Sequence, residues 1–245
     1  MLHIHQNGYR LHFHPSNLAE QLWINPKYKQ EVHKFFRAYL KPKDKVIDVG
    51  ANIGTTTLTA SLSVGDTGKV WSIEPHPRIY KFLIENLELN RITNVETINI
   101  ALGNQASEIT ITNDRRDDMN RVGTGSLSVK MDCLDELIMD SENIALLKVD
   151  VEGYEKFVFE GAKKILKNAN CIYFEISKTH FSWFEYKIYD LLELLLDKGF
   201  YLFRMQENGY LSKIDSKYET DRVEDIIGIK DIEDFLYRTK FVISK

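Results

Sequence analysis

The stretch from Lys45 to Gly54, KVIDVGANIG, constrains the fold of this chain more than any other. It begins with β-branched and apolar residues, which is the composition of a strand buried on both faces. Gly50 and Gly54 follow that strand, and residues 55–60 are typical of the first turns of a helix. A strand, a glycine turn and a helix open the nucleotide-binding α/β folds. We expect Gly50 to let the backbone approach a ligand and Gly54 to let helix and strand pack closely.

This turn differs from a dinucleotide-binding motif, because Asp48 precedes the first glycine and Asn52 stands between the two glycines. An acid at a strand end suits a cationic group of a ligand better than a pyrophosphate. The α-ammonium group of S-adenosylmethionine is such a group. By itself, the stretch therefore indicates either an adenosylmethionine pocket or an ordinary strand-to-helix turn of another α/β protein.

A second acid, Glu74, follows the next predicted buried strand, residues 69–73. An acid at this place, about 20 residues beyond the glycine turn, holds the ribose hydroxyls in α/β folds. A carboxylate suits that task because its two oxygens can accept hydrogen bonds from both hydroxyls. With Asp48 and Gly50 upstream, we predict that Glu74 binds ribose rather than capping a helix.

Predicted strands and helices alternate along the rest of the chain, which favours a parallel sheet with right-handed crossovers. Two segments with alternating polarity predict a β-hairpin inserted into this frame, and the polar loop between them could cover a site. The predicted helices cover residues 31–40, 77–90, 157–166 and 185–198. The predicted strands cover residues 95–102, 108–112, 127–131, 145–150, 171–176, 200–205, 210–214 and 240–244, with loop and short helix over 215–237.

Composition and charge exclude several classes of protein. The 245 residues are 43% hydrophobic, enough for one large domain, and the net charge of −4 gives no general electrostatic basis for nucleic-acid binding. No uncharged apolar run reaches the roughly 18 residues of a membrane span, and the first residues do not resemble a signal peptide. We therefore expect a cytoplasmic protein. Cys133 and Cys171 lie far apart among apolar residues, so we predict buried, reduced thiols.

Residues 1–44 are rich in histidine and aromatic side chains and are predicted to form a strand and helix extension that packs on the core. A histidine cluster suggests a metal site. However, these histidines follow a strand-like alternation, in which alternate residues share a face, so we predict surface histidines rather than ligands. The histidines concerned are His3, His5, His12 and His14.

Several stretches, taken together, resemble the FkbM family of adenosylmethionine-dependent methyltransferases in order and spacing. The most specific one is KVDVEGYE, residues 148–155, followed by Gly161 and Ala162, whereas several methyltransferase families share the DVGANIG turn. The other matching stretches are residues 72–75, 101–103, 123–127 and 134–135. The resemblance covers roughly residues 30–245 and leaves the N-terminal segment unexplained.

The resemblance implies a Rossmann-like class I methyltransferase fold in a domain of residues 45–245. This α/β fold has a seven-stranded, mostly parallel sheet flanked by helices, with the last strand antiparallel, and the inserted hairpin and loop would lie at about residues 107–131. The implied reaction is O-methyl transfer to a hydroxyl of a sugar, glycan or natural-product-type small molecule.

The resemblance also implies roles for individual residues. The methionine part of adenosylmethionine would be surrounded by Asp48, Gly50 and Asn52. Its ribose would be bound by Glu74, and its adenine would lie along Ala101 and Leu102. Asp150 and Glu152, at the carboxyl end of the fourth strand, are the predicted catalytic residues. Our hypothesis is that Asp150 is the base or orients the acceptor hydroxyl, and the alternative is a structural acid that ties the strand end to the next loop.

A metal-assisted mechanism is a second hypothesis. Asp150 and Glu175, at neighbouring strand tips, could share Mg²⁺ or Mn²⁺, with Glu152 or His180 nearby. Such an ion would lower the pKa of the acceptor hydroxyl. Many family members carry a histidine two residues after the acid that matches Glu175, and this chain has Ser177 there.

Other functions and partners stay open. An RNA or protein methyltransferase is disfavoured by the acidic balance and by the lack of an Asn-Pro-Pro-Tyr-type tetrapeptide at residues 150–153, and a third reading is a non-catalytic adenosylmethionine-binding protein. Homo-oligomerisation is neither indicated nor excluded. Aromatic residues after the fifth strand could stack on a sugar face or belong to the core; they are Phe181, Trp183, Phe184 and Tyr186.

Overall fold

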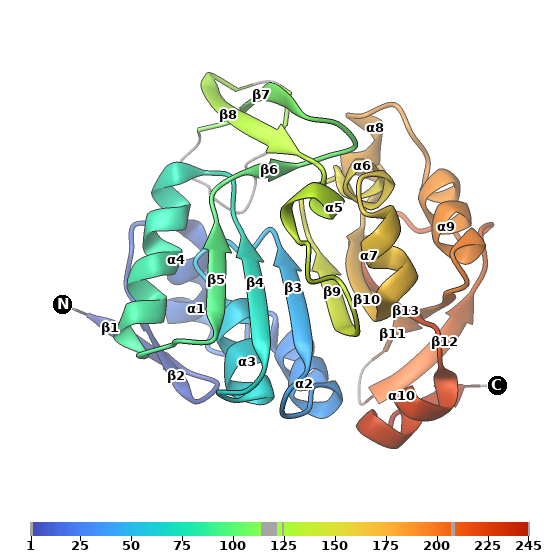
Figure 1. Cartoon of the computed structure of the whole chain (residues 1–245), viewed down its shortest axis with the longest axis horizontal. Coiled ribbons are helices and arrows are strands. Elements are labelled where there is room, and N and C mark those ends of the chain that lie inside the picture. Colours follow the sequence, from blue (N-terminus) through green and yellow to red (C-terminus); the bar gives the residue numbers. More distant parts are fainter. Residues whose placement is uncertain (1, 114–121, 124, 207–208, 245) are drawn as a thin grey trace.

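The structure, a computed structural model, describes residues 2–113, 122–123, 125–206 and 209–244. Within these residues, a nine-stranded sheet runs through the centre of the molecule with helices on both faces (Figure 1). Its strands, in spatial order, are β14 (Val242–Ser244), β12 (Tyr210–Ile214), β11 (Tyr201–Met205), β13 (Glu224–Ile229), β10 (Ala169–Ile176), β9 (Ile144–Val149), β3 (Lys45–Val49), β4 (Lys69–Ile73) and β5 (Val95–Ile98).

Five neighbouring strands run parallel, namely β5, β4, β3, β9 and β10 in spatial order. The next strand, β13, is antiparallel to both β10 and β11. These five strands, with β13 and β11, match the predicted seven-stranded, mostly parallel sheet. The strands β12 and β14 extend the sheet beyond the predicted count. The prediction of loop and short helix over residues 215–237 is wrong for β13. This strand is a short run of buried residues after two acids, and periodicity cannot assign such a run before its neighbouring strands are known.

Two groups of helices cover the two faces of the sheet. One face packs against α2 (Gln30–Tyr39), α3 (Thr55–Val64) and α10 (Ile232–Thr239), and the other against α5 (Leu134–Leu137), α6 (Glu155–Glu160), α7 (Lys163–Asn168) and α9 (Ile188–Asp197). None of the helices in the described ranges has the length and hydrophobicity to traverse a bilayer. The predicted helix over 157–166 is divided between α6 and α7 at Gly161, where a Cβ atom would lie 2.0 Å from the carbonyl oxygen of Gly103.

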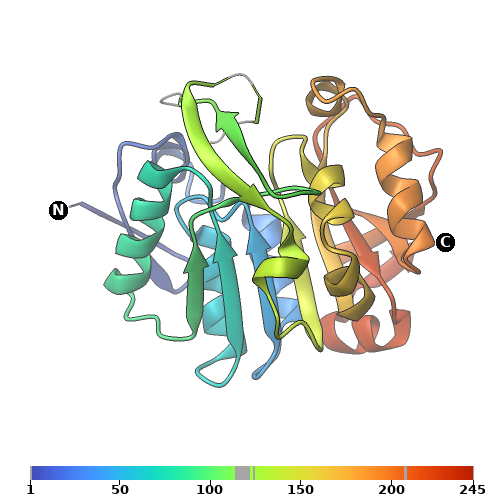
Figure 2. The ribbon, with the colours of Figure 1, turned by 45° about the horizontal axis from the view of Figure 1, so that its top comes forward.

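A small sheet lies above the carboxyl ends of the parallel strands, as Figures 1 and 2 show. It consists of β6 (Ala101–Leu102), β8 (Leu127–Asp132) and β7 (Ser107–Ile111), with β7 and β8 forming the predicted hairpin. The predicted strand over residues 95–102 is therefore split, because β5 ends at Ile98 and β6 pairs with β8. Of the predicted loop over 113–125, residues 114–121 and 124 lie outside the described residues.

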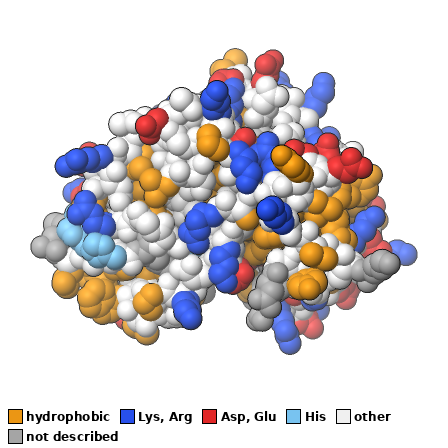
Figure 3. Space-filling model, turned by 90° about the horizontal axis from the view of Figure 1, so that it is seen from below, with side chains coloured by type: hydrophobic (Ala, Val, Ile, Leu, Met, Phe, Trp, Pro, Cys, Tyr) orange, Lys and Arg blue, Asp and Glu red, His pale blue; other side chains and the backbone are white. Residues whose placement is uncertain are grey.

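The N-terminal extension packs beside α4 (Pro77–Leu89). It contains β1 (His3–Gln6), β2 (Tyr9–His12) and α1 (Asn17–Ile24), and the Asn86 side chain of α4 accepts a hydrogen bond from the His12 N–H at 2.8 Å. The surface prediction fails for His14, which is buried and stacks on the Phe82 ring at 4.0 Å. Other histidines reach the surface at the N-terminal side of the molecule, at the left of Figure 3.

The two cysteines differ in burial. Cys171 is buried in β10 as predicted, whereas Cys133 is only half-buried at the start of α5, and both are free thiols. The prediction of two buried thiols is therefore wrong for Cys133, because the residue caps a short helix at the edge of the core.

Candidate active site

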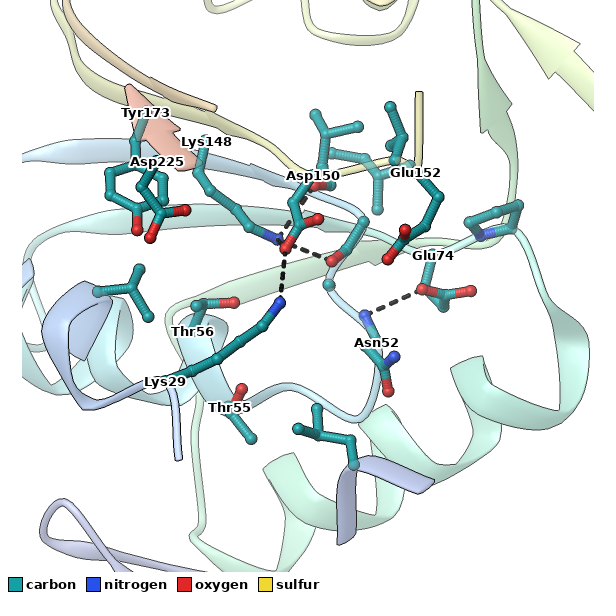
Figure 4. Close-up of a pocket in the computed structure, with 18 of the residues that line it drawn as sticks. Lys29, Asn52, Thr55, Thr56, Glu74, Lys148, Asp150, Glu152, Tyr173 and Asp225 are labelled. Carbon is teal, nitrogen blue, oxygen red and sulfur yellow. Dashed lines mark hydrogen bonds and ion pairs between the residues drawn. The ribbon is translucent and has the colours of Figure 1, made fainter. Parts of the chain in front are cut away.

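A cavity of about 380 Å³ opens at the carboxyl ends of β3, β4 and β9. In open α/β sheets this edge is where ligands bind, because the loops that leave the strands diverge there. The walls come from the turn between β3 and α3, the tips of β4 and β9, residues 100–102, and residues 27–33 of the N-terminal extension. Figure 4 shows these elements surrounding the cavity, with Lys29 on the extension side and Glu74 at the opposite end.

The two glycines of the turn are required by protein contacts. Gly50 has a φ of +74°, and a Cβ atom there would lie 1.8 Å from the backbone oxygen of Asp150. Gly54 has a φ of +92°, and a Cβ atom there would lie 2.6 Å from the Leu83 side chain of α4. Gly50 therefore lets the tip of β9 pack on the turn, and Gly54 makes room for α4 rather than for the strand.

Asp48 does not line the cavity, although the sequence predicts it at the methionine part of the cofactor. Its side chain is fully buried and accepts hydrogen bonds from the Thr56 and Thr57 hydroxyls at 2.8 and 2.7 Å. The Lys148 ammonium lies 3.1 Å from its other oxygen. These contacts tie Asp48 to the start of α3 and to β9, behind the described residues that line the cavity.

Lys148 joins the tips of β3 and β9. Its side chain is 3% exposed, and its ammonium donates to the carbonyl oxygens of Gly50 at 2.8 Å and Val49 at 3.2 Å. Sequence reasoning missed this residue, although a lysine inside an otherwise apolar buried strand is a signal of a buried partner. The partner proves to be Asp48.

Glu74 lines the cavity at the tip of β4, together with Asn52. Its two carboxylate oxygens accept hydrogen bonds from the backbone N–H groups of Asn52 and His76, both at 2.9 Å. These bonds fix the carboxylate at the cavity wall, and carboxylate oxygens are acceptors that suit hydroxyl groups. The structure thus brings Gly50, Asn52 and Glu74 to one wall, as the sequence predicts.

Apolar residues form the end of the cavity next to Glu74. The predicted adenine contacts Ala101 and Leu102 line this part, and their neighbours are Ile100, Ile111 and Val122 from the small sheet and its approach. The small sheet therefore supplies an apolar slot at the place where the sequence predicts adenine.

Asp150 lies between two ammonium groups. Its carboxylate is 3.5 Å from the Lys29 ammonium and 3.8 Å from that of Lys148. Burial by itself would raise the pKa of Asp150, but the two lysines outweigh it, so the pKa lies below the ordinary value. Asp150 is therefore ionised and a weak base. Sequence reasoning assigned no role to Lys29, because nothing local indicates that the N-terminal extension reaches this edge.

A second group of side chains lies beside the cavity, at the tips of β9 and β10. The Nδ1 atom of His180, in α8 (Lys178–Ser182), is 3.4 Å from the Glu152 carboxylate and 3.9 Å from that of Glu175. One potential ligand atom from each of these residues lies within 4.8 Å of the others, whereas Asp150 is not part of the group. Glu175 is thus grouped with Glu152 and His180, whereas Asp150, its predicted partner in holding a metal, lies against the two lysines.

Glu175 differs from the other acids in its protonation. Burial raises its pKa to about 9, and the negative charge of Asp150 adds to this effect. At neutral pH its carboxyl group is therefore protonated and can donate a hydrogen bond. A metal ion would have to displace that proton.

The four predicted acceptor aromatics divide into two kinds. Phe181 and Tyr186 are buried core residues, and Phe184 packs against the same core. Trp183 is 38% exposed and stacks on the His180 ring at 4.8 Å. Of the four, Trp183 is the one whose ring remains accessible beside the acids.

Glu155 fixes the turn that carries Glu152. One oxygen of its buried carboxylate accepts hydrogen bonds from the backbone N–H groups of Val151 at 3.1 Å and Gly153 at 3.2 Å. Glu152 itself has a φ of +54°, and Gly153 packs on the backbone of His180. Burial raises the pKa of Glu155 to about 7.

The raised pKa of Glu155 predicts a stability that falls as pH rises. Between the ordinary carboxyl pKa and about 7, the folded protein keeps this proton while the unfolded chain loses it. The contribution of the proton to the free energy of unfolding is therefore complete at low pH, falls as pH rises through this range and is lost above about 7. The loss amounts to about 3 kcal/mol. Because a glutamine oxygen can still accept both N–H groups, Glu155→Gln should be more stable than the wild type at pH 8 and similar at pH 5. Urea unfolding across this range measures the difference, and a difference that does not change with pH would contradict the prediction.

Comparison with known proteins identifies the family. Residues 48–210 match the methyltransferase FkbM domain. The chain belongs to the FkbM methyltransferase family. It is an S-adenosylmethionine-dependent methyltransferase, as the sequence predicted. The matched residues include the tips of β3, β4 and β9 but not the N-terminal extension that supplies Lys29.

Relatives of this FkbM protein are named for different substrates. The hexuronic acid methyltransferase AglP of Haloferax volcanii is 28% identical over 177 residues, which are 69% of this chain and 72% of that protein. A Saccharolobus solfataricus protein named as a cobalt-precorrin-6B C(15)-methyltransferase is 32% identical over 119 residues, 47% of this chain and 58% of that protein.

A solved structure shares the fold. A Clostridium thermocellum protein described as an rRNA methylase superposes with a TM-score of 0.51 at 16% identity, covering 82% of this chain and 95% of that one. The predicted Rossmann-like class I fold is thereby confirmed.

Proposed function

We propose that this FkbM protein methylates a hydroxyl of a sugar, glycan or natural-product-type small molecule. The carrying observation is the layout of the cavity, with Glu74 and an apolar slot at one end, Asp150 and Lys29 toward the other, and Glu152 between Asp150 and Glu74 (Figure 4). The similarity to a hexuronic acid methyltransferase supports a sugar acceptor. Trp183, exposed beside the acids, could stack on a sugar ring.

The residues of the cavity fit adenosylmethionine in chemistry. Ala101 and Leu102 suit adenine, the Glu74 carboxylate suits the ribose hydroxyls, and the turn at Gly50 suits the amino acid part. When bound, this cofactor supplies an electrophilic methyl group on a positively charged sulfur.

In this proposal Glu152 removes the proton of the acceptor hydroxyl. Its carboxylate lines the cavity and has the His180 ring beside it at 3.4 Å, so a proton taken up there can be shared with the imidazole. Asp150 is the weaker base because Lys29 and Lys148 lower its pKa. We therefore assign proton transfer to Glu152, whereas Asp150, as an ionised carboxylate, is left to position a bound cationic group.

The cofactor assignment predicts that Glu74→Gln weakens adenosylmethionine binding roughly 10-fold or more, because charge-assisted hydrogen bonds to the ribose are lost. Isothermal titration calorimetry measures the dissociation constant. Glu96→Gln, which changes a half-exposed acid paired with Lys69, is the control and should leave binding unchanged. Unchanged binding in Glu74→Gln, or no binding to the wild type, would remove the assignment.

The acceptor class is tested by following a labelled methyl group. The enzyme is incubated with labelled adenosylmethionine and, separately, free hexuronic acids, neutral hexoses and the glycan, RNA and protein fractions of a cell extract. Label in the sugars or glycans supports the proposal. Label confined to RNA or protein would favour the alternative methyltransferase function.

A divalent metal is the alternative way to activate the hydroxyl. Glu152, Glu175 and His180 offer carboxylate and imidazole ligand atoms close together, although the comparisons give no support for a metal. Dialysis against a chelator decides between the two. Full methyl transfer after dialysis favours the protein base, and a loss that Mg²⁺ or Mn²⁺ restores favours the metal.

A further inference from the structure

Lys29 reaches the cavity from a part of the chain that lies outside the matched FkbM domain. It immediately precedes α2 and has a left-handed backbone with a φ of +50°. Figure 4 shows its side chain extending toward Asp150, and its ammonium is 3.5 Å from the Asp150 carboxylate. The side chain is 46% exposed, so it is accessible from the open cavity and can change partners.

The two lysines beside Asp150 are not equivalent. Lys148 is 3% exposed and is held by Asp48 and by the carbonyl oxygen of Gly50. Moving it would leave the buried Asp48 without its cation, at a high cost. The partner of Lys29, Asp150, is 23% exposed and keeps Lys148 beside it when Lys29 moves, so Lys29 is the lysine that can turn to a ligand.

The N-terminus of α3 adds partial positive charge at the same place. Thr55 and Thr56, its first residues, line the cavity next to Lys29 (Figure 4). The N-cap residue Gly54 provides no side-chain acceptor, and the first turn contains no acid. The first N–H groups of a helix attract an anion when no side chain caps them. Lys29 and α3 thus offer an anionic group two sources of positive charge, and Asp150 offers a cationic group its partner.

We propose that the amino acid group of adenosylmethionine inserts between Lys29 and Asp150, with its α-carboxylate on Lys29 and its α-ammonium on Asp150. The ion pair between Lys29 and Asp150 is exchanged for two contacts to the zwitterion. This inference rests on the proposed cofactor assignment, and it makes the N-terminal extension part of the donor site. Lys29 is then a cofactor-binding residue supplied from outside the matched domain.

Three ligands separate this role from a structural one. Adenosylmethionine has both charged groups of the amino acid, decarboxylated adenosylmethionine lacks the carboxylate, and 5′-methylthioadenosine lacks the whole amino acid part. Calorimetric titration of each ligand into the full chain gives its dissociation constant for the wild type, Lys29→Met and Lys29→Arg. Lys34→Met is the control, because Lys34 lies on α2 and forms an exposed pair with Glu31.

We expect Lys29→Met to weaken adenosylmethionine binding roughly 10- to 100-fold, the range for a lost hydrogen bond to a charged group. Decarboxylated adenosylmethionine should bind unchanged or more tightly, since Asp150 is released to its ammonium, and 5′-methylthioadenosine should be unaffected. Lys29→Arg should restore most of the affinity, and Lys34→Met should bind all three ligands as the wild type does.

Two results would overturn the inference. One is wild-type affinity of Lys29→Met for adenosylmethionine. The other is an equal loss for all three ligands, which would mean that Lys29 only holds the extension in place. A wild-type protein that binds none of the ligands would instead overturn the cofactor assignment, so the two failures are distinguishable.

Discussion

Glu152→Gln should lower the rate of methyl transfer by about 10²- to 10⁴-fold, the usual contribution of a general base. The amide is close to the carboxylate in size but cannot take the proton of the acceptor hydroxyl. Binding of adenosylmethionine should stay within about twofold, because the proposed contacts of the cofactor do not include Glu152. The measurement is turnover with the acceptor found by labelling, together with calorimetric titration of the cofactor.

Glu185→Gln is a matched control for this experiment. Glu185 also has a left-handed backbone, with a φ of +57°, and it is exposed on the loop after α8. This variant should turn over at the wild-type rate. If Glu152→Gln also kept its turnover while binding the cofactor normally, Glu152 would have no part in proton transfer and the metal-assisted route would gain support.

Gly50→Ala should lower the free energy of unfolding by about 4 kcal/mol and abolish cofactor binding. The added methyl group would lie 1.8 Å from the backbone oxygen of Asp150, and a backbone atom cannot move aside as a flexible side chain can. Either the turn or the tip of β9 must shift, and both form the cavity. Urea unfolding measures the first effect and calorimetry the second.

Gly65→Ala isolates the effect of the clash. Gly65 has a φ of +66°, close to that of Gly50, but a Cβ atom there would meet nothing within 4 Å. Its ψ of 179° lies outside the left-handed helical region, in a conformation that glycine adopts almost exclusively. Gly65→Ala should therefore cost only this backbone penalty, about 1–3 kcal/mol. Equal losses in the two variants would show that the contact with Asp150 is unimportant.

The predictions from sequence hold where a local pattern carries the information. The strand, turn and helix around Gly50 are one continuous segment, and Glu74 follows the next strand at the expected distance, so both could be placed at one edge of a parallel sheet. Ala101 and Leu102 were placed at the same edge by the same argument. The prediction joined them to β5, whereas they belong to the small sheet.

The predictions fail where a partner is distant in the chain. Asp48 was predicted to contact a ligand because Lys148, which lies on β9 and is distant in sequence, was not recognised as its buried counterion. Asp150 looked like a free base because nothing local indicates that Lys29 lies beside it. The strand β13 was missed because its register depends on β10 and β11, which lie on either side of it.

The sequence by itself determined the family, the Rossmann-like sheet and the edge at which the cofactor is expected, because glycine positions and strand-end acids are local consequences of backbone geometry. Only the tertiary structure decided the charge state of that edge. Two lysines from different parts of the chain hold Asp48 and Asp150, while burial keeps Glu175 protonated. Charges interact through space and respond to burial, so their roles follow from the packed molecule and not from the order of residues.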